Sequence, residues 1–450
     1  MQITLPQTII TRRDHWAWYL YDFGNSAYAA VVLLAIYSAY FKQEIVGGTE
    51  GTRLWGLATG IAMLVVAITS PILGAIADLS GSKKRFLFFF TVVACLFTAT
   101  LFFTGRGSVL LGMLLFILAE IGYRSAQVFY NALLPEIATP AEIGRVSGLG
   151  WAIGSAGGIV CLIIVLPLIV LIGGTFTIRL SFVFTAVFFA LAAGPIFFWL
   201  QERARPQPLP AGDSYVTVGF KQLWSTFNAA RRFREFIKFM IAFVVYNDGV
   251  ITALNFAAII GVVLYGMDQQ QLIMFIILVQ VMSVVGAFAF GMLADSWSVK
   301  GSLELALLLM LAVVFLLLFN SSQYSFFLTG GLAGFALTGV QSVSRTMVGL
   351  LSPPGQSAEF YGLFAVAGRT SSFIGPTVYG IVAAEAAHWF VSAGETAIIG
   401  EQMGQRLAIL SIAAFLGLGL VLLRFVNERE GMAVARLSTD WPTNHSISPD

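Results

Sequence analysis

The stretch Gly74-Ala75-Ile76-Ala77-Asp78 returns 217 residues later as Gly291-Met292-Leu293-Ala294-Asp295. Each copy ends an apolar run and leads directly into a short polar turn. The same spacing aligns further landmarks: Gly122 with Gly339, Ser125 with Ser342, Leu134 with Leu351 and Glu142 with Glu359. A Gly-x-x-x-Asp match is common by itself, but a spacing shared by separate landmarks indicates that the chain is one unit written twice.

The composition indicates an integral membrane protein. Hydrophobic residues make up 58% of the chain and charged residues 11%, whereas a soluble domain carries about 25% charged residues. About 20 apolar residues span a bilayer core as a helix, and the clearest apolar runs are 57–77, 86–103, 159–172 and 303–319. These runs do not alternate polar with apolar residues, so they favour helices over the strands of a barrel.

Several other classes of protein are disfavoured. Cys95 and Cys161 both lie inside apolar runs, so we expect neither a disulfide framework nor a metal site. The sequence shows no phosphate loop, nucleophile elbow or metal-ligand spacing, which argues against an enzyme and against an ATP-driven pump. We therefore expect no cofactor and no nucleic-acid partner. The polar N-terminus through Arg12-Arg13-Asp14 predicts that the first apolar run is retained and not cleaved.

Apolar runs between turn signals predict twelve transmembrane helices in an all-α membrane fold. The first set lies near 16–41, 53–77, 85–104, 108–132, 146–172 and 179–200; the second lies near 236–264, 270–294, 302–320, 326–350, 359–384 and 405–426. We therefore expect an N-terminal six-helix half, a linker, a C-terminal six-helix half and a tail, over residues 1–200, 201–235, 236–427 and 428–450. In the linker, residues 220–227 carry apolar side chains at helical spacing beside arginines. This pattern indicates either a helix lying on the membrane surface or a flexible linker with chance aromatics.

The distribution of basic residues predicts the orientation. One side of the predicted topology holds 17 arginines and lysines near span ends, and the other side holds only Lys42, Arg53, Arg106, Arg179 and Arg406. Loops that remain in the cytoplasm carry the excess of positive charge. We therefore expect both termini and the linker to be cytoplasmic, in a multi-pass protein of the cell (inner) membrane.

Twelve spans in two halves joined by a long linker resemble the major facilitator superfamily. The stretch 74–84 is similar to that superfamily's signature loop, and a partial second copy lies at 291–300. The resemblance implies a polar latch that closes the cytoplasmic mouth in one state; the alternative is a plain turn with positive flanks that sets the topology. The candidate gate residues are Gly74, Asp78, Gly81, Lys83, Lys84, Gly291, Asp295 and Lys300. The second copy has Ser298 and Val299 where a glycine and a cation would be expected.

Further segments narrow this resemblance to one branch of the superfamily. They are 21–28, 129–136, 147–154, 246–249, and 339–345 followed by 359–363. Together they look like the vacuole effluxers, permeases similar to autophagy-related protein 22. The resemblance implies a secondary transporter, with amino-acid export as the activity most associated with the branch. The sequence departs from the branch at Phe23-Gly24, where Trp-Ala is usual, and at Ser155, where an aromatic residue is common.

Ionisable residues inside the predicted spans mark the candidate site, because a charge facing lipid is costly. They are Asp22, Glu120, Arg124, Asp248, Arg345 and Arg369. Asp22 and Asp248 lie in the first spans of the two halves, near the polar residues Asn25, Tyr28 and Asn247. A carboxylate in a partly dry cavity can take up and release a proton, so these two are the candidate coupling sites. The alternative is that each braces adjacent spans through hydrogen bonds.

Glu120 and Arg124 are four residues apart on the fourth span and therefore share a helix face. Gln127 and Asn131 extend this polar stripe, and the tenth span presents Gln341 and Arg345. An arginine fork can bind both oxygens of a carboxylate, so we expect Arg124 or Arg345 to take an anionic group of the substrate. The alternative is a structural ion pair. Arg369 is expected near Asp248 or near the cytoplasmic gate.

The sequence therefore predicts a secondary active transporter that works by alternating access and is functional as a monomer among membrane lipids. The substrate is expected to be a small polar or charged, amino-acid-like metabolite moved with protons. Two alternatives remain: an efflux permease for hydrophobic or drug-like compounds, and a membrane sensor that no longer transports. The charged residues of the spans favour the polar substrate.

Overall fold

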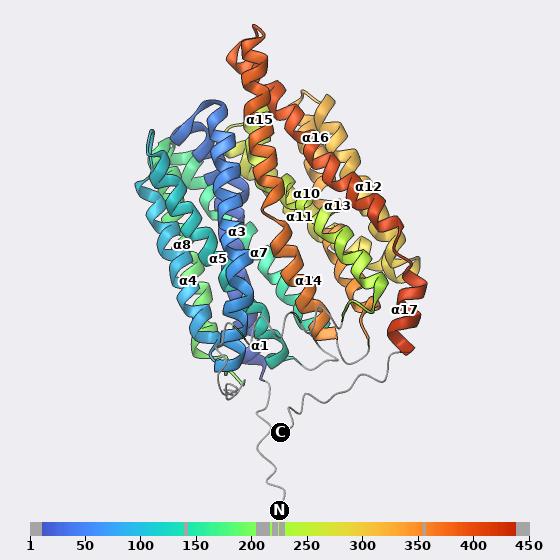
Figure 1. The fold of residues 1–450 in the computed structure, drawn as a ribbon. Coiled ribbons are helices and arrows are strands. Elements are labelled where there is room, and N and C mark those ends of the chain that lie inside the picture. Colours follow the sequence, from blue (N-terminus) through green and yellow to red (C-terminus); the bar gives the residue numbers. More distant parts are fainter. Residues whose placement is uncertain are drawn as a thin grey trace, which may run out of the picture.

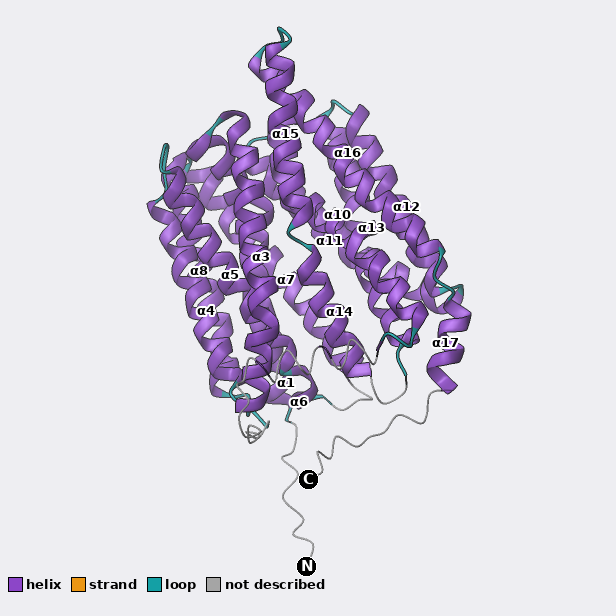
Figure 2. Cartoon of the chain, viewed as in Figure 1, coloured by secondary structure: helices purple, strands orange, loops and turns teal. Residues whose placement is uncertain are grey.

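The computed structural model describes residues 11–138, 143–203, 217, 224, 230–353 and 357–437. Within these ranges the side chains of 71, 75, 78, 79, 135, 143–145, 147–148, 295, 357–359 and 369–371 are not described. Every element in the described residues is a helix (Figure 2). Most of the predicted surface helix at 220–227 lies outside the described residues.

The elements follow the order of the predicted spans. The first half contains α1 Arg12–Tyr28, η1 Ala29–Ala35, α2 Tyr37–Tyr40, η2 Phe41–Val46, α3 Gly48–Ser80, α4 Lys83–Thr100, η3 Leu101–Phe103, α5 Val109–Ala132, α6 Leu134–Ile137, α7 Ile143–Ile172 and α8 Gly174–Phe198. The second contains α10 Arg234–Tyr265, α11 Gln269–Ser296, α12 Val299–Phe319, α13 Gln323–Leu351, α14 Ser357–Ser371, α15 Ile374–Ser392, α16 Ala397–Arg424 and α17 Glu428–Leu437. The segments η1 and η2 are π-helical and η3 is a 3₁₀ turn.

The predicted spans appear as eleven long helical segments and one interrupted crossing. Within the described residues, eleven segments are long and apolar enough to cross a membrane. The first runs from Arg12 to Val46 and consists of α1, η1, α2 and η2 in succession. The predicted eleventh span, 359–384, is instead broken after Ser371. Its two pieces, α14 and α15, are stacked end to end along the bundle (Figure 1).

The two ends of the bundle differ in the elements that they carry. The lower end in Figure 1 holds the beginning of α1, the beginning of α14 and the helix α17, and the upper end holds the α15–α16 connection. At the lower end α3 stops at Gly81, which has a φ of 57° and a ψ of 34°. This left-handed conformation favours glycine, so Gly81 makes the tight turn expected in the signature loop. Gly74 and Gly291 do not contribute close helix contact here, because a Cβ at either meets no described atom within 4 Å.

The two halves meet closely at the upper end, where α3 crosses α15. A Cβ added at Gly56 would overlap the carbonyl oxygen of Pro376 and lie 3.1 Å from the Cα of Gly380. Nearby, the Trp55 indole donates to the carbonyl of Asn255 at 2.9 Å. Small residues let helix backbones approach this closely in a membrane. The upper end is therefore sealed by direct backbone packing between the halves.

Polar contacts reinforce this seal. Lys42 forms an ion pair with Glu401, and both side chains are largely buried. The Gln405 amide donates to the Thr52 hydroxyl at 2.8 Å, and Gln269 donates to the carbonyl of Ala35 at 2.7 Å. All of these contacts join the first half of the chain to the second. They must break whenever the upper end opens.

Candidate functional site

Asp22 lies on α1 where three helices converge. The side chain of Asn25, one turn further along α1, lies close to its carboxylate, and the positive charge of Arg345 on α13 attracts it from the other half. The carboxylate packs on Gly154 of α7, where an added Cβ would overlap Asp22 Oδ2 and come within 3.2 Å of Ser26 Oγ. Glycine at position 154 therefore makes room for this acid. The Arg345 side chain keeps exposed surface, whereas Asp22 is half-buried.

A second charged pair lies within α5. Arg124 Nε donates to Glu120 Oε1 at 2.7 Å, with Glu120 fully buried and Arg124 21% exposed. The guanidinium lies 5.2 Å from the centre of the Tyr123 ring, which stacks on Tyr28 at a centroid distance of 4.4 Å. Gln127 completes the cluster by donating to the Tyr123 hydroxyl at 3.1 Å. Four of the predicted site residues therefore lie together: Tyr28, Glu120, Arg124 and Gln127.

Three buried polar atoms in this region lack a protein partner among the described residues. They are Asn25 Oδ1, the Tyr28 hydroxyl and Glu120 Oε2. The Tyr28 hydroxyl lies close to the Glu120 carboxylate, but no hydrogen bond joins the two groups. Buried polar groups are nearly always hydrogen-bonded. A ligand or water that supplies donors would complete this site.

The two charged pairs belong to one region. Tyr123 lies within electrostatic range of Glu120 and Arg124 and also of Asp22. Helix α1 ends at Tyr28 and continues as the π-helical segment η1. Such segments are frequent at functional sites because they alter the direction of side chains within a helix. The region therefore combines two acids, two arginines and a distorted helix.

The Glu120–Arg124 pair gives a testable prediction about stability. Removing one partner of a buried ion pair leaves an uncompensated charge, which typically costs ~3–5 kcal/mol. Because Arg124 keeps some exposure, we expect Glu120→Ala to cost about 2 kcal/mol or more, measured by thermal unfolding of the purified protein in detergent. The double variant Glu120→Gln with Arg124→Gln should recover much of this loss. A double variant no more stable than Glu120→Ala would contradict the ion-pair interpretation.

Asp248 and Asn247 hold the broken eleventh span. The backbone N–H of Gly375, at the start of α15, donates to both carboxylate oxygens of Asp248 at 2.9 and 3.0 Å. The Asn247 amide donates to the carbonyl of Gly368 in the last turn of α14 at 3.1 Å. Helix ends leave such groups unsatisfied, so these neighbours on α10 satisfy both ends of the break. Asp248 thus makes hydrogen bonds of the kind expected of a residue that braces adjacent spans.

The other predicted site residues are less engaged. Gln341 is half-buried and Asn131 is exposed, and no polar contact is recorded for either among the described residues. The side chains of Arg369, Asp78 and Asp295 lie outside the described part of the chain. The predictions made for these three residues therefore have no structural counterpart to compare.

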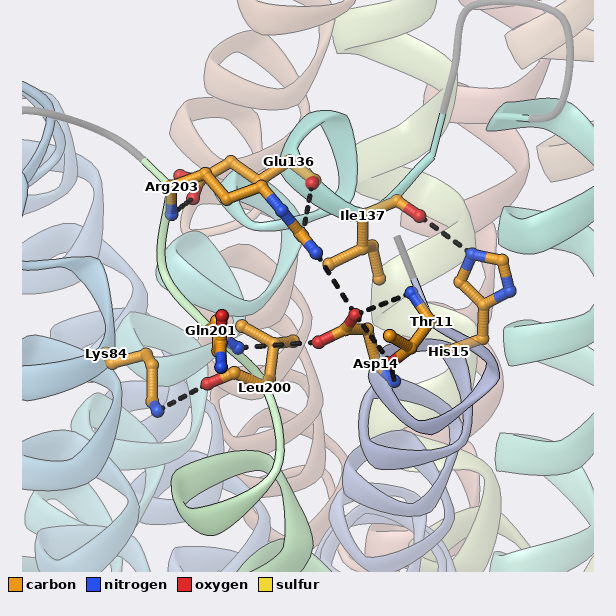
Figure 3. A network of polar contacts seen from close by, with 9 residues as sticks. All are labelled: Thr11, Asp14, His15, Lys84, Glu136, Ile137, Leu200, Gln201 and Arg203. Atoms are coloured by element: carbon orange, nitrogen blue, oxygen red, sulfur yellow. Dashed lines mark hydrogen bonds and ion pairs between the residues drawn. The ribbon is translucent and has the colours of Figure 1, made fainter. Parts of the chain in front are cut away.

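At the lower end the predicted gate lysines bind within their own halves. Lys83 forms an ion pair with Glu136 at 3.0 Å. Lys84 donates to the carbonyl of Leu200 at 2.6 Å (Figure 3). Glu202 accepts the backbone N–H groups of both lysines at the start of α4. Burial raises the pKa of Glu202 above its usual range, while these hydrogen bonds favour its charged form. We call this arrangement the α4 clamp.

The α4 clamp extends to the beginning of α1. Arg203 Nη2 contacts Asp14 Oδ2 at 3.1 Å and Arg203 Nη1 donates to the carbonyl of Glu136 at 2.7 Å (Figure 3). His15 contacts the carbonyl of Ile137 at 2.7 Å. No sequence pattern used above marks Asp14, Glu136, Glu202 or Arg203 as contact residues. The available signal was a similar stretch, Phe425-Val426-Asn427-Glu428-Arg429, which shares the Glu-Arg pair and apolar first two positions with residues 199–203.

Solved structures with this arrangement of helices are transporters of the major facilitator superfamily (MFS). A bacterial homolog of the human lysosomal transporter Spinster, inward-facing and unoccupied, matches with a TM-score of 0.67 and 14% identity, over 96% of this chain and 98% of that one. A D-xylose-proton symporter matches with a TM-score of 0.69 and 12% identity, over 93% and 98%. At this identity the likeness concerns the fold, and it confirms the predicted fold class.

Sequence comparison identifies the family. An uncharacterized MFS-type transporter of Bacillus subtilis (strain 168) is 27% identical over 437 residues, which cover 95% of this chain and 97% of the relative. Autophagy-related protein 22 of Yarrowia lipolytica is 23% identical, over 84% of this chain and 76% of the relative. The family described as "Vacuole effluxer Atg22 like" matches residues 54–436. The protein belongs to this family of MFS-type transporters. It is therefore a multi-pass membrane transporter and not an enzyme.

Proposed function

We propose that the protein is a proton-coupled secondary transporter for a small zwitterionic, amino-acid-like metabolite. The cluster of charged and unpaired polar groups around Glu120 and Asp22 carries this proposal. Arg124 and Arg345 offer cationic forks for a carboxylate, and Glu120 Oε2, Asn25 Oδ1 and the Tyr28 hydroxyl offer acceptors for an ammonium group. A hydrophobic substrate would leave these buried groups unsatisfied, at a cost of about 1–3 kcal/mol each.

The proposed division of roles follows from the contacts of each acid. Glu120 is neutralised by Arg124 within its own helix, and Asp248 is engaged with the N–H of Gly375. Asp22 has no such ion-pair or backbone partner among the described residues and is attracted by Arg345 across the two halves. A change in the separation of the halves therefore alters the environment of Asp22 directly. We assign proton coupling to Asp22 and substrate binding to Arg124 and Arg345.

The proposed orientation places the lower end in the cytoplasm of a cell whose inner membrane holds the protein. The excess of arginine and lysine near span ends supports this orientation. The chain is then an N-terminal half over 1–200, a linker over 201–235, a C-terminal half over 236–427 and a tail over 428–450. The sealed upper end corresponds to a state closed to the outside. The name of the family, vacuole effluxer, supports movement of substrate out of a compartment.

Two measurements test the proposed substrate class. A thermal-shift screen of the purified protein against amino acids, peptides, sugars and drug-like compounds should give its largest shifts with amino-acid-like zwitterions. Ligands that raise the unfolding temperature should then move into proteoliposomes faster when a pH gradient is imposed. Binding and flux confined to hydrophobic cations would contradict the proposal, as would a failure to move any ligand that binds.

Arg345 gives a sharper test of substrate binding. Arg345→Lys keeps the charge but loses the planar fork that binds two carboxylate oxygens. We expect the apparent affinity to fall about tenfold, because one charge-assisted hydrogen bond contributes on the order of 1.5–3 kcal/mol. The matched control is Arg53→Lys, which should retain affinity. Arg53 lies at the upper end, in a partly exposed ion pair with Glu50. An unchanged affinity in Arg345→Lys would rule out direct ligation by the fork.

A further inference from the structure

The α4 clamp has a counterpart in the second half of the chain. Glu428 accepts the N–H groups of Val299 and Lys300 at the start of α12, and its Oε2 also accepts the Ser298 hydroxyl at 2.9 Å. Lys300 Nζ donates to the carbonyls of Arg424 and Val426, at 3.1 and 2.8 Å. Glu202 and Lys84 make equivalent contacts with backbone groups in the α4 clamp, although the Ser298 hydroxyl contact has no counterpart there. We call this counterpart the α12 clamp.

The two clamps differ at their arginines. In the α4 clamp, Arg203 is engaged with Asp14 and with the carbonyl of Glu136. In the α12 clamp, Arg429 is exposed and no partner is recorded for it among the described residues. Glu235, which begins α10 as Asp14 begins α1, accepts instead from the N–H of Asn427 and from Lys238. Among the described residues, the α12 clamp therefore has no internal anion like the one that neutralises the arginine of the α4 clamp.

A pocket lies beside this arginine. It has a volume of ≈ 370 Å³, and its cationic lining residues are Lys300, Arg424 and Arg429. Glu428 is its acidic lining residue, and its carboxylate already accepts the three hydrogen bonds described above. Arg424 is also exposed, without a recorded partner in the described part of the chain. Lys300 also pairs with Glu304 at 3.8 Å. Among the described residues, Arg424 and Arg429 therefore leave the pocket with a net positive charge, which suits a small anion.

Two aromatic side chains place this pocket at the membrane boundary. It lies where α16 ends at Arg424 and where α12 begins at Val299. Phe425, which lines it, is 67% exposed, and Trp297, two residues before α12, is 64% exposed. Exposed aromatic side chains at span ends lie among lipid headgroups. An anion that reaches this pocket can therefore come from the lipid itself.

We infer that the pocket of the α12 clamp binds the phosphate of an anionic phospholipid. Arg424 and Arg429 contact the phosphate oxygens, and Phe425 and Trp297 lie against the glycerol and upper acyl region. Basic pockets at the cytoplasmic ends of spans bind anionic headgroups in this way. The lipid supplies from outside the chain the anion that Asp14 supplies in the α4 clamp. It thereby fastens α17 to the ends of α12 and α16.

Native mass spectrometry of the full-length protein tests this inference. Released from vesicles of phosphatidylcholine with a minority of phosphatidylglycerol, the protein should retain at least one phosphatidylglycerol molecule. In the double variant Arg424→Gln with Arg429→Gln, the apparent affinity should fall more than tenfold, since each basic residue contributes about 1 kcal/mol to such binding. The matched control is Arg13→Gln with Arg85→Gln. It removes two exposed charges from the same end of the bundle and should bind normally.

Three outcomes would overturn the inference. Equal losses in the two double variants would show diffuse attraction to the membrane surface and no defined site. Retention of phosphatidylglycerol by Arg424→Gln with Arg429→Gln would place the lipid elsewhere. Displacement of the lipid by millimolar inorganic phosphate would identify a free anion as the ligand. Thermal unfolding of each variant in detergent verifies that it is folded. The single variant Arg429→Lys keeps both positive charges and should retain most of the binding.

Discussion

Asp22→Asn is expected to abolish transport driven by a pH gradient while leaving substrate exchange intact. Asparagine is nearly isosteric with aspartate, so the packing against Gly154 should persist. It can neither bind nor release a proton, and it no longer attracts Arg345. Proteoliposomes with an imposed pH gradient measure the first activity, and counterflow of labelled substrate at equal pH measures the second.

Asp248→Asn separates coupling from bracing. The amide oxygen can still accept the N–H of Gly375, but the negative charge at the start of α15 is lost. We expect this variant to keep pH-driven uptake and to unfold at a lower temperature, because an acid near a helix N-terminus contributes ~0.3–1 kcal/mol. Loss of pH-driven uptake in Asp248→Asn alone would move the coupling site to the seventh span. Unchanged uptake in both variants would contradict a coupling role for either acid.

The positions of the spans could be predicted because the apolar runs are long and turns interrupt them clearly. The tenth span was expected at 326–350 and is observed at Gln323–Leu351. The break in the eleventh span has a local signal in Gly375-Pro376, because proline is tolerated in the first turn of a helix and disrupts a helix interior. The contacts at the break could not be predicted locally. They come from Asn247 and Asp248, more than a hundred residues away, which satisfy backbone groups on both sides of it.

The candidate site was predictable in part for the same reason. Glu120 and Arg124 pair along one helix, so their spacing alone predicts the contact. The approach of Asp22 to Arg345 depends on how the two halves pack, and neither residue has a sequence signal for the other. The clamps at the lower end were missed because Glu202 and Glu428 are 226 residues apart, whereas the Gly-x-x-x-Asp copies are 217 apart. Loop lengths differ between the halves, so one spacing cannot align every element.

A leucine at position 56 should stop transport without unfolding the protein. The α3–α15 crossing brings Gly56 against the carbonyl of Pro376 and the Cα of Gly380, so any side chain there separates the two halves. Overpacking typically costs ~1–3 kcal/mol, and a cost borne only by the state closed at the upper end depopulates that state about 5- to 150-fold. Because alternating access requires the upper end to seal in every cycle, we expect flux in proteoliposomes to fall at least tenfold.

Gly417→Leu is the matched control for Gly56→Leu, since a Cβ at Gly417 on α16 meets no described atom within 4 Å. It should transport at close to the wild-type rate. A cysteine probe made by Thr52→Cys measures how accessible the upper end is to water. Thr52 is 1% exposed and contacts Gln405. In a background without Cys95 and Cys161, an impermeant maleimide added from outside should label this probe faster in Gly56→Leu than in Gly417→Leu. Normal flux in Gly56→Leu would mean that the close α3–α15 contact is not needed in the cycle. Faster labelling with lost flux would establish it as the outer seal that alternates with opening at the cytoplasmic end.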